Sequence, residues 1–289
     1  MAPGQEDLSR GLRAAARRAA SGAAGLPVDL HVLSADRGRA VFLASGARVD
    51  LVVKAYDDAP ALAHEVRVLD LARGLGVPVP DVLAFEPGPP GVTIMTRLRG
   101  SPLTPAMGEA AAVEAGAALR RLHELRADPP YGGGQHRWDE FVVGWSRREA
   151  DACARLGILS PAESSAAVAR VSSARDLLTG RPTGLAHGDL QPDHVLVESG
   201  HLTGLIDFVD AKPGDGLLDV AVLTLWDRAL TAPLLRGLGL AADADTALLL
   251  DRYRLVRHLA AAAWLLDRGH ATAAARHAEA VRFRVRGGA

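Results

Sequence analysis

One segment in the second half of the chain limits its possible folds and functions more than any other. It places Asp189 on a predicted loop, His194 five residues later, and Asp207 at the end of an apolar run. Two apolar runs, 195–197 and 202–206, are separated by a Ser-Gly pair, which predicts two short strands joined by a tight turn. Because such a hairpin folds back on itself, we expect the three polar side chains to converge. One carboxylate on a loop and two ligands flanking a hairpin are typical of metal-assisted phosphoryl transfer.

The motifs in this segment have a recognisable spacing. The chain carries H-G-D at 187–189, I-D-F at 206–208 and G-D-G-L-L-D-V-A at 214–221. It thereby resembles the antibiotic phosphotransferase family, whose pattern H-G-D-x-x-x-x-N, I-D-[FW] and G-D-P-x-x-D-[LV]-A is a variant of the protein-kinase motifs. One position departs from this pattern, since His194 stands where the family usually has Asn. The macrolide-phosphorylating branch looks similar at that position, whereas the hygromycin B branch is similar in its I-D-W run and Trp-containing helix.

The resemblance implies an α+β, protein-kinase-like fold with two lobes. We expect a small, β-rich, nucleotide-binding N-lobe with one main helix at 1–99, and a larger, mostly helical C-lobe at 100–289 for catalysis and acceptor binding. Hydrophobic periodicity agrees, because it predicts short strands in the first hundred residues and helices afterwards. The predicted strands of the N-lobe are 29–33, 39–43, 49–53, 82–85 and 91–95. The predicted helices of the chain are 6–20, 61–73, 109–125, 138–155, 161–178, 217–230, 244–266 and 271–285.

A lysine and a glutamate in the N-lobe are candidates for nucleotide binding. The chain has only two lysines, and Lys54 ends the third predicted strand. Glu65 follows eleven residues later on the predicted helix. In a kinase-like lobe Lys54 would contact the α- and β-phosphates of the nucleotide, and Glu65 would orient it. The alternative is a surface lysine at a strand end and a surface glutamate on a helix.

The adenine ring is expected at the hinge between the lobes. We place this hinge at Thr96, Arg97 and Leu98, where backbone N–H and C=O groups would contact the ring. The turn at 34–38 would cover the phosphates, although it lacks the pattern G-x-G-x-x-G.

Each polar residue of the catalytic segment has an expected role. Asp189 would accept or orient the proton of the acceptor hydroxyl, and Asp207 would bind Mg²⁺. His194 is the second candidate metal ligand, and its imidazole suits Mn²⁺ better than Mg²⁺. Four possibilities stay open for His194: binding through water, direct binding with reduced affinity, loss of a second metal, or an inactive pseudokinase.

Composition excludes several other classes of protein. The 289 residues carry a net charge of −1, which gives no electrostatic reason to expect nucleic acid as a partner. The longest apolar run, at 259–266, is too short to span a membrane, and arginines interrupt the N-terminus where a signal peptide would be apolar. A single cysteine, Cys153, excludes disulfides, and we expect it to be a buried packing residue. We therefore expect a cytoplasmic protein, monomeric or weakly dimeric.

The leading functional hypothesis is an ATP- or GTP-dependent O-phosphotransferase that inactivates an antibiotic. A cationic aminoglycoside or aminocyclitol is placed slightly ahead of a macrolide as the acceptor. The alternatives are a small-metabolite kinase of the same fold and a nucleotide-binding pseudokinase. Turnover of nucleotide with a panel of acceptors distinguishes these three.

Overall fold

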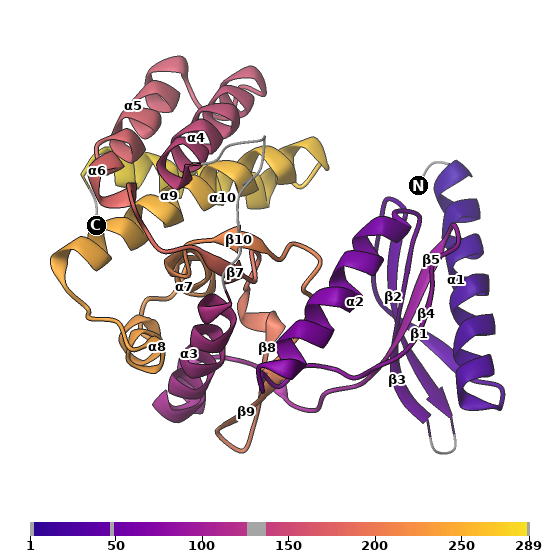
Figure 1. Ribbon diagram of the computed structural model, residues 1–289. Helices are drawn as coiled ribbons and strands as arrows, with labels where there is room; N and C mark the ends of the chain where they lie inside the picture. Colours follow the sequence, from indigo (N-terminus) through magenta and orange to yellow (C-terminus); the bar gives the residue numbers. More distant parts are fainter. Residues whose placement is uncertain (1–2, 47–48, 126–136, 288–289) are drawn as a thin grey trace. The chain divides into compact units, whose positions relative to one another are not determined.

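A five-stranded antiparallel sheet forms the framework of the first part of the chain. The structure, a computed structural model, describes residues 3–46, 49–125 and 137–287. The strand order is β1-β2-β3-β5-β4, and β3 therefore lies in the centre with β2 and β5 as neighbours (Figure 1). The strands are β1 (Asp29–Asp36), β2 (Arg39–Gly46), β3 (Val49–Tyr56), β4 (Val82–Glu86) and β5 (Gly91–Thr96).

Two helices cover opposite faces of this sheet (Figure 1). The helix α1 (Pro3–Ala24) packs Leu12, Ala16 and Ala20 against Phe42 and Val53 in one hydrophobic cluster. These helix residues are spaced by four, so they lie on one face of α1. The helix α2 (Ala59–Gly74) packs against β3, β4 and β5.

The alternation of side chains along β3 determines which residue faces α2. Val53 and Ala55 are fully buried in the cluster with α1. Neighbouring residues of a strand point to opposite faces of the sheet, so Lys54 points toward α2. Lys54 was expected to end its strand, but β3 continues to Tyr56, because Lys54 pairs with Val41 of β2 and Thr93 of β5. The lysine therefore lies inside the sheet rather than at its edge.

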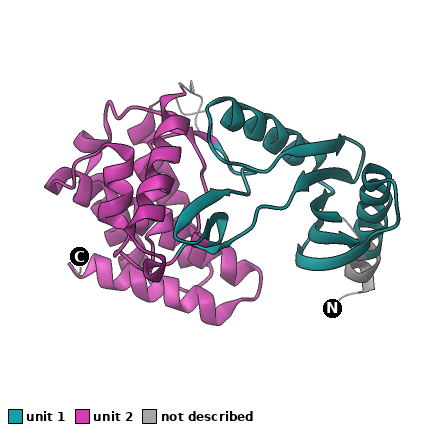
Figure 2. Ribbon diagram, turned by 90° about the horizontal axis from the view of Figure 1, so that it is seen from below, with its two compact units in different colours: residues 1–103, 193–211 teal, residues 104–192, 212–289 magenta. Residues whose placement is uncertain are grey.

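A second sheet, in the order β6-β8-β9, contains the hairpin expected from the sequence. Its strands are β6 (Ser101–Pro102), β8 (Val195–Glu198) and β9 (His201–Leu205). The backbone N–H of Leu103 also donates to Val195, and that of Leu205 donates to Pro78. These bonds explain why the chain divides into unit 1, residues 1–103 with 193–211, and unit 2, residues 104–192 with 212–289 (Figure 2). The expected division at 99 had placed this hairpin with the second lobe.

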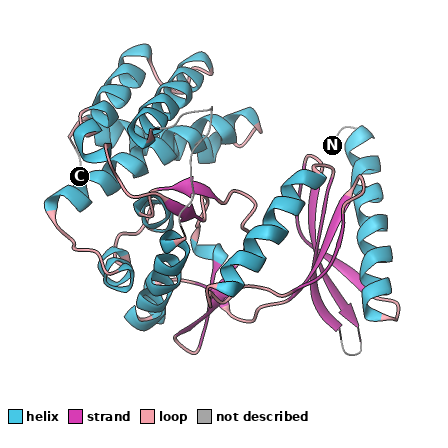
Figure 3. Ribbon diagram, in the orientation of Figure 1, coloured by secondary structure: helices cyan, strands magenta, loops and turns pink. Residues whose placement is uncertain are grey.

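Unit 2 is mostly helical (Figure 3). Its longest helix, α9, packs against α4, α7 and α10, and a two-stranded sheet joins β7 to β10. Its helices are α3 (Glu109–Glu124), α4 (Trp138–Arg155), α5 (Pro161–Ser172), α6 (Arg175–Leu178), α7 (Leu217–Leu223), α8 (Thr231–Leu238), α9 (Ala244–Asp267) and α10 (Ala271–Val285). Its strands are β7 (Gly184–Ala186) and β10 (Lys212–Gly214). The described residues also include two single turns of 3₁₀ helix, η1 (Pro105–Met107) and η3 (Pro192–His194).

The expected α+β fold is confirmed, with three differences in unit 2. The helix predicted at 161–178 is interrupted after Ser172, and the one predicted at 217–230 already ends at Leu223. The sequence analysis missed α8 altogether. The glycine-rich link at 131–136 lies outside the described residues. Among the helices that the structure describes, none is long and apolar enough to cross a membrane.

Candidate functional site

A buried ion pair joins the sheet of unit 1 to its helix α2. The helix starts at Ala59 because the side chain of Asp58 accepts the backbone N–H of Ala61. This start places Glu65 on the second turn, where its Oε1 lies 2.6 Å from the Nζ of Lys54. The side chain of Glu65 is 1% exposed and that of Lys54 is 6% exposed. Each buried charge is therefore stabilised mainly by the other. The structure thus brings together the two residues expected to bind nucleotide.

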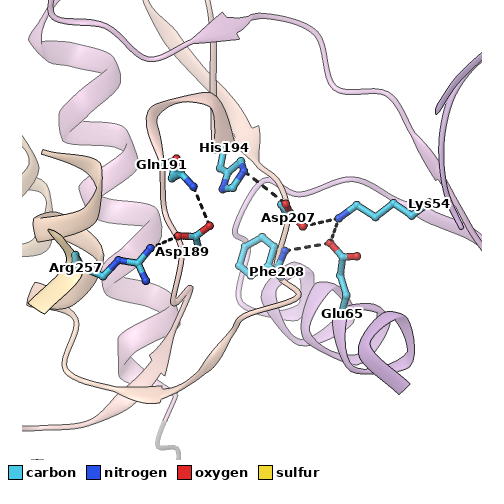
Figure 4. A network of polar contacts seen from close by, with 8 residues as sticks. All are labelled: Lys54, Glu65, Asp189, Gln191, His194, Asp207, Phe208 and Arg257. Carbon is cyan, nitrogen blue, oxygen red and sulfur yellow. Dashed lines mark hydrogen bonds and ion pairs between the residues drawn. The ribbon is translucent and has the colours of Figure 1, made fainter. Parts of the chain in front are cut away.

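Asp207 completes a cluster of three charges in unit 1 (Figure 4). Its Oδ1 lies 2.7 Å from the Nζ of Lys54, and the backbone N–H of Phe208 donates to Oε1 of Glu65 at 3.1 Å. Burial alone would lower the pKa of Lys54, but the charges of Glu65 and Asp207 outweigh burial and raise this pKa above its usual value. Lys54 is therefore fully protonated, as phosphate binding requires.

The backbone at Asp207 is left-handed, with a φ of 67°. Few residues other than glycine adopt this region, and those that do are concentrated at functional sites. Here the conformation is fixed from both sides, because Lys54 binds the side chain and Glu65 accepts the next backbone N–H. The strained turn holds a carboxylate that is 38% exposed at the end of a hairpin.

His194 lies next to this carboxylate and belongs to the same unit. Its Nε2 is 3.6 Å from Oδ2 of Asp207, on the side of the carboxylate away from Lys54. Mg²⁺ in nucleotide enzymes typically binds one or two carboxylates together with substrate phosphates. No cluster of three or more His, Cys, Asp or Glu that suits a metal occurs among the described residues. Asp207 and His194 therefore fit a metal ion that arrives with a nucleotide, rather than a closed protein cage.

The segment expected to contact the adenine ring, 96–98, has backbone groups that could bind a ligand. Thr96 ends β5, and its hydroxyl accepts the backbone N–H of Asp81. Arg97 is exposed and pairs with Asp50 at 3.0 Å. The backbone groups of Arg97 and Leu98 form no hydrogen bond to a described residue, so they are available to a ligand.

In unit 2, the buried carboxylate of Asp219 holds the loop before Asp189. Its two oxygens accept the backbone N–H groups of His187 and Gly188, each at 2.9 Å, and one also contacts Nε2 of His123 at 3.0 Å. Burial opposes ionisation, but these donors outweigh it and lower the pKa of Asp219. Gly188 has a φ of 84°, which favours glycine at this position. His123 is thus a packed, hydrogen-bonded residue.

Asp189 follows this loop and pairs with an arginine that the sequence analysis did not single out. Nη2 of Arg257 on α9 binds Oδ1 of Asp189, and Nε2 of Gln191 donates to Oδ2 at 3.0 Å (Figure 4). The side chains of Asp189 and Arg257 are 23% and 21% exposed. The carboxylate is thus fixed in position by two donors, while it remains accessible to a small molecule.

A second buried aspartate of unit 2, Asp215, is held by side chains from three parts of the chain. Arg181 binds both oxygens of Asp215, at 2.8 and 3.1 Å, and the hydroxyl of Tyr253 donates to it at 2.7 Å. Nε1 of Trp138 donates to that hydroxyl in turn. Asp215 and Asp219 therefore both accept backbone N–H groups of the loops beside them. Cys153 is buried, as expected, and burial raises its pKa to about 11.

The comparison with protein families agrees with this arrangement. The model of the phosphotransferase enzyme family, APH, matches residues 29–276, which is most of the chain. This chain belongs to the phosphotransferase enzyme family. The match includes both the cluster around Lys54 and the loop around Asp189.

Solved structures show the same fold for this phosphotransferase. A thermostable mutant of aminoglycoside phosphotransferase APH(4)-Ia aligns with a TM-score of 0.73 at 20% identity, over 94% of this chain and 99% of that one. Another structure of that enzyme is a ternary complex with ADP and hygromycin B, with a TM-score of 0.72 at 20% identity, over 94% of this chain and 98% of that one. Macrolide 2'-phosphotransferase MphH from Brachybacterium faecium aligns with a TM-score of 0.65 at 23% identity, over 90% and 96% of the two chains. These TM-scores show that the chain shares the kinase-like fold of these enzymes.

A relative among characterised proteins is a metabolic enzyme. Homoserine kinase of Neisseria meningitidis serogroup B is 32% identical over 109 residues, which is 37% of this chain. The match spans about a third (33%) of that kinase's length.

The sequence reasoning missed Arg257 and Gln191. Gln191 carried a usable signal, because it lies two residues after Asp189 on the same loop. Arg257 carried none, since it stands on α9, a helix rich in arginine. The side chain of Asp227 accepts the backbone N–H of Ala229.

Proposed function

We propose that this phosphotransferase moves the γ-phosphoryl group of ATP or GTP onto a hydroxyl of a small molecule. The cluster of Lys54, Glu65 and Asp207 is the observation that carries the proposal. The cluster consists of a buried, protonated lysine, a glutamate on a helix and a partly exposed aspartate. Phosphoryl transfer uses this arrangement to neutralise the phosphates of the nucleotide.

On the nucleotide side, Lys54 binds the α- and β-phosphates and Glu65 keeps its ammonium group in place. Asp207, with His194 beside it, holds Mg²⁺, or Mn²⁺ in its place. When bound, the ion supplies positive charge that offsets the phosphates. The backbone of Thr96, Arg97 and Leu98 contacts the base. An enzyme that uses these nucleotides is expected in the cytoplasm.

On the acceptor side, Asp189 orients the hydroxyl and receives its proton. The hydroxyl oxygen forms a bond to the γ-phosphorus, the bond from that phosphorus to the β–γ bridging oxygen breaks, and the nucleoside diphosphate leaves. Arg257 positions one oxygen of Asp189, and Gln191 orients the second oxygen. A general base of this kind contributes roughly 10²–10⁴-fold to the rate.

Two acceptor classes follow from the comparisons. An antibiotic acceptor, and with it a role in resistance, is supported by the likeness to the aminoglycoside and macrolide phosphotransferases. A small metabolite is supported by the likeness to homoserine kinase. Arg257 pairs with Asp189, so this carboxylate alone gives neither class of acceptor a net charge to bind.

A turnover panel tests the proposal. Nucleotide labelled at the γ-phosphate is incubated with hygromycin B, a macrolide, L-homoserine and other hydroxylated metabolites, using the wild-type protein and Asp189→Ala. We expect transfer to one class, loss of at least about 10²-fold in Asp189→Ala, and unchanged nucleotide binding. Nucleotide binding without transfer to any acceptor would support the pseudokinase instead. Resistance of a sensitive host that expresses the gene separates the antibiotic from the metabolite.

A further inference from the structure

The helices α9 and α10 of unit 2 pack against each other and meet at two polar contacts. Nδ1 of His258 lies 3.0 Å from Nδ1 of His277, and Nε of Arg284 lies 3.5 Å from Oδ1 of Asp251. Residue numbers rise along α9 as they fall along α10, so the two helices are antiparallel. Arg254 follows Asp251 by three residues and precedes His258 by four. It therefore lies on the same face of α9, between the two contacts.

Arg254 is a buried cation whose protein partners are neutral. The residue is 3% exposed, and its Nη2 donates to the hydroxyls of Thr224, at 2.6 Å, and of Thr231, at 3.1 Å. In the part of the chain that the structure describes, no ion pair joins it to a carboxylate, and its buried Nε has no acceptor. Burial, together with the charges of Arg228 and Arg284, lowers the pKa of Arg254 to about 10. The guanidinium nevertheless stays charged at neutral pH, and a buried charge without an opposite charge is costly.

A second buried nitrogen next to Arg254 also lacks an acceptor. Nε2 of His258 is buried and has no hydrogen-bond partner among the described residues. His258 reaches the same segment as Arg254, because its ring lies 4.9 Å from that of Trp226, which stands between the two threonines that Arg254 binds. Burial, and then the charge of Arg284, lowers the pKa of His258 to about 2, so the charge of Arg284 reaches both residues. Unpaired N–H groups and positive charge are thus gathered at one place.

The carboxylate nearest to this place is already shared by other arginines. The oxygens of Asp251 lie 2.5 Å from Nη1 of Arg252, 3.6 Å from Nη2 of Arg170 and 3.5 Å from Nε of Arg284. One negative charge therefore serves three guanidinium groups, and Arg254 adds a fourth without a carboxylate of its own. Charges in a protein interior are screened much less than exposed charges, so this surplus attracts an anion.

We propose that unit 2 binds one small inorganic anion, a halide or phosphate, between α9, α10 and the segment 224–231. Nε of Arg254 and Nε2 of His258 donate hydrogen bonds to this anion, and the charge of Arg284 attracts it. His258 carries its proton on Nε2 when Nδ1 of His277 donates to Nδ1 of His258. The anion supplies the negative charge that Arg254 lacks and links α9 to α10. The inference does not depend on the proposed phosphotransferase function.

The dependence of stability on the anion provides the first test. The full chain is unfolded with urea at constant ionic strength and pH, while sodium chloride or sodium phosphate replaces sodium gluconate, whose anion is too bulky to be enclosed. A ligand that binds only the folded state raises the folding equilibrium constant in proportion to its concentration, once this exceeds the Kd. We therefore expect about a tenfold rise in that constant for each tenfold rise in the bound anion. The two series identify whether chloride or phosphate is bound, and a response to neither would overturn the proposal.

Arg254→Met distinguishes an anion site from an arginine that only holds two threonines. An apolar side chain of similar volume often replaces a buried charge at no loss of stability. In gluconate the variant should therefore be at least as stable as the wild type, and it should lose the response to chloride or phosphate. The matched control is Arg282→Met on α10, which removes an arginine that pairs with Glu163 at 2.8 Å and should keep the wild-type response. A loss of stability in Arg254→Met that is equal in gluconate and in the anion would overturn the proposal.

A crystallographic measurement on the wild-type protein gives an answer even if the variant does not fold. Crystals are grown once with sodium bromide, whose anion scatters anomalously, and once with sodium phosphate. We expect an anomalous peak or a tetrahedral density within hydrogen-bonding distance of Nε of Arg254 and Nε2 of His258. A water molecule at that position under both conditions would overturn the proposal. A bromide or phosphate peak there without any response in the urea experiment would show an adventitious ion only, and would overturn it as well.

Discussion

The Oε1 atom of Glu65 lies 2.6 Å from the Nζ atom of Lys54, and both side chains are buried between the sheet and α2. The same oxygen accepts the backbone N–H of Phe208. Glu65 therefore connects the lysine to the segment that carries Asp207. A single carboxylate thus organises the nucleotide side of this protein.

The first prediction concerns this pair. Lys54→Ala and Glu65→Ala should each destabilise the protein by about 3–5 kcal/mol, because each leaves a buried charge without its partner. The double variant should cost less than the sum of the two, by more than about 0.5 kcal/mol. Urea unfolding measures this coupling. The exposed pair Arg73–Asp81, treated identically, should show at most about 1 kcal/mol of coupling. Strict additivity at Lys54 and Glu65 would mean that they do not act together.

Asp207→Asn should abolish the dependence of nucleotide affinity on Mg²⁺. The substitution keeps the size of the side chain and removes the charge that offsets the cation. Calorimetric titration with ATP, with and without Mg²⁺, is the measurement, and Asp81→Asn on the same unit is the control. If Mg²⁺ strengthens ATP binding in Asp207→Asn as much as in the wild type, the metal binds elsewhere.

Asp219→Ala should destabilise unit 2 although Asp219 reaches no substrate. The backbone N–H groups of His187 and Gly188 would lose their acceptor inside the protein, at about 1–3 kcal/mol each. Transfer should fall as well, because this loop positions Asp189. Asp227→Ala, which removes an exposed acceptor of one backbone N–H, should cost less than about 1 kcal/mol in the same urea titration. Equal effects of the two substitutions would show that Asp219 does not hold the loop.

His194→Asn should shift the preference of the enzyme from Mn²⁺ toward Mg²⁺. An amide oxygen is a harder ligand than an imidazole nitrogen, and Mg²⁺ prefers oxygen. His194→Ala should be worse with both metals, because it provides no ligand at all. The measurement is kcat/KM with each metal for the three proteins. An unchanged ratio between the metals in His194→Asn would show that His194 is not a metal ligand.

The last prediction concerns acid stability. Nδ1 of His258 on α9 lies 3.0 Å from Nδ1 of His277 on α10. Burial, together with the charges of Arg257 and Arg276, lowers the pKa of His277 to about 4, and burial holds the pKa of His258 lower still. Both rings are thus neutral in the folded protein, whereas in the unfolded chain they bind protons below about pH 6.5.

The unfolded state therefore binds more protons between about pH 6.5 and 4, and stability must fall as the pH falls through this range. The slope is at most about 1.4 kcal/mol per pH unit for each histidine. Urea unfolding at pH 7.5, 6 and 5 should show this loss, and His277→Gln should reduce it. His31→Gln, which removes an exposed histidine, is the control. A loss that His277→Gln leaves unchanged would assign it to other groups.

The sequence by itself determined the elements with strong local signals. Polar residues at the ends of short apolar runs predicted the hairpin of β8 and β9, and the long periodic helices were located within a few residues. It also singled out Lys54, Glu65, Asp189 and Asp207 as candidates, Asp189 and Asp207 from the motif and Lys54 and Glu65 from their spacing on a predicted strand and helix. The short helix α8 was missed, since an eight-residue apolar segment has little periodicity to detect.

Only the tertiary structure decided which distant side chains meet. Arg257 follows Asp189 by 68 residues, so no local pattern relates the two. The grouping of 193–211 with the first hundred residues likewise depends on the pairing of β8 with β6. Local propensities act over a turn or a strand, whereas the pairing of Arg257 with Asp189 depends on how α9 packs within unit 2.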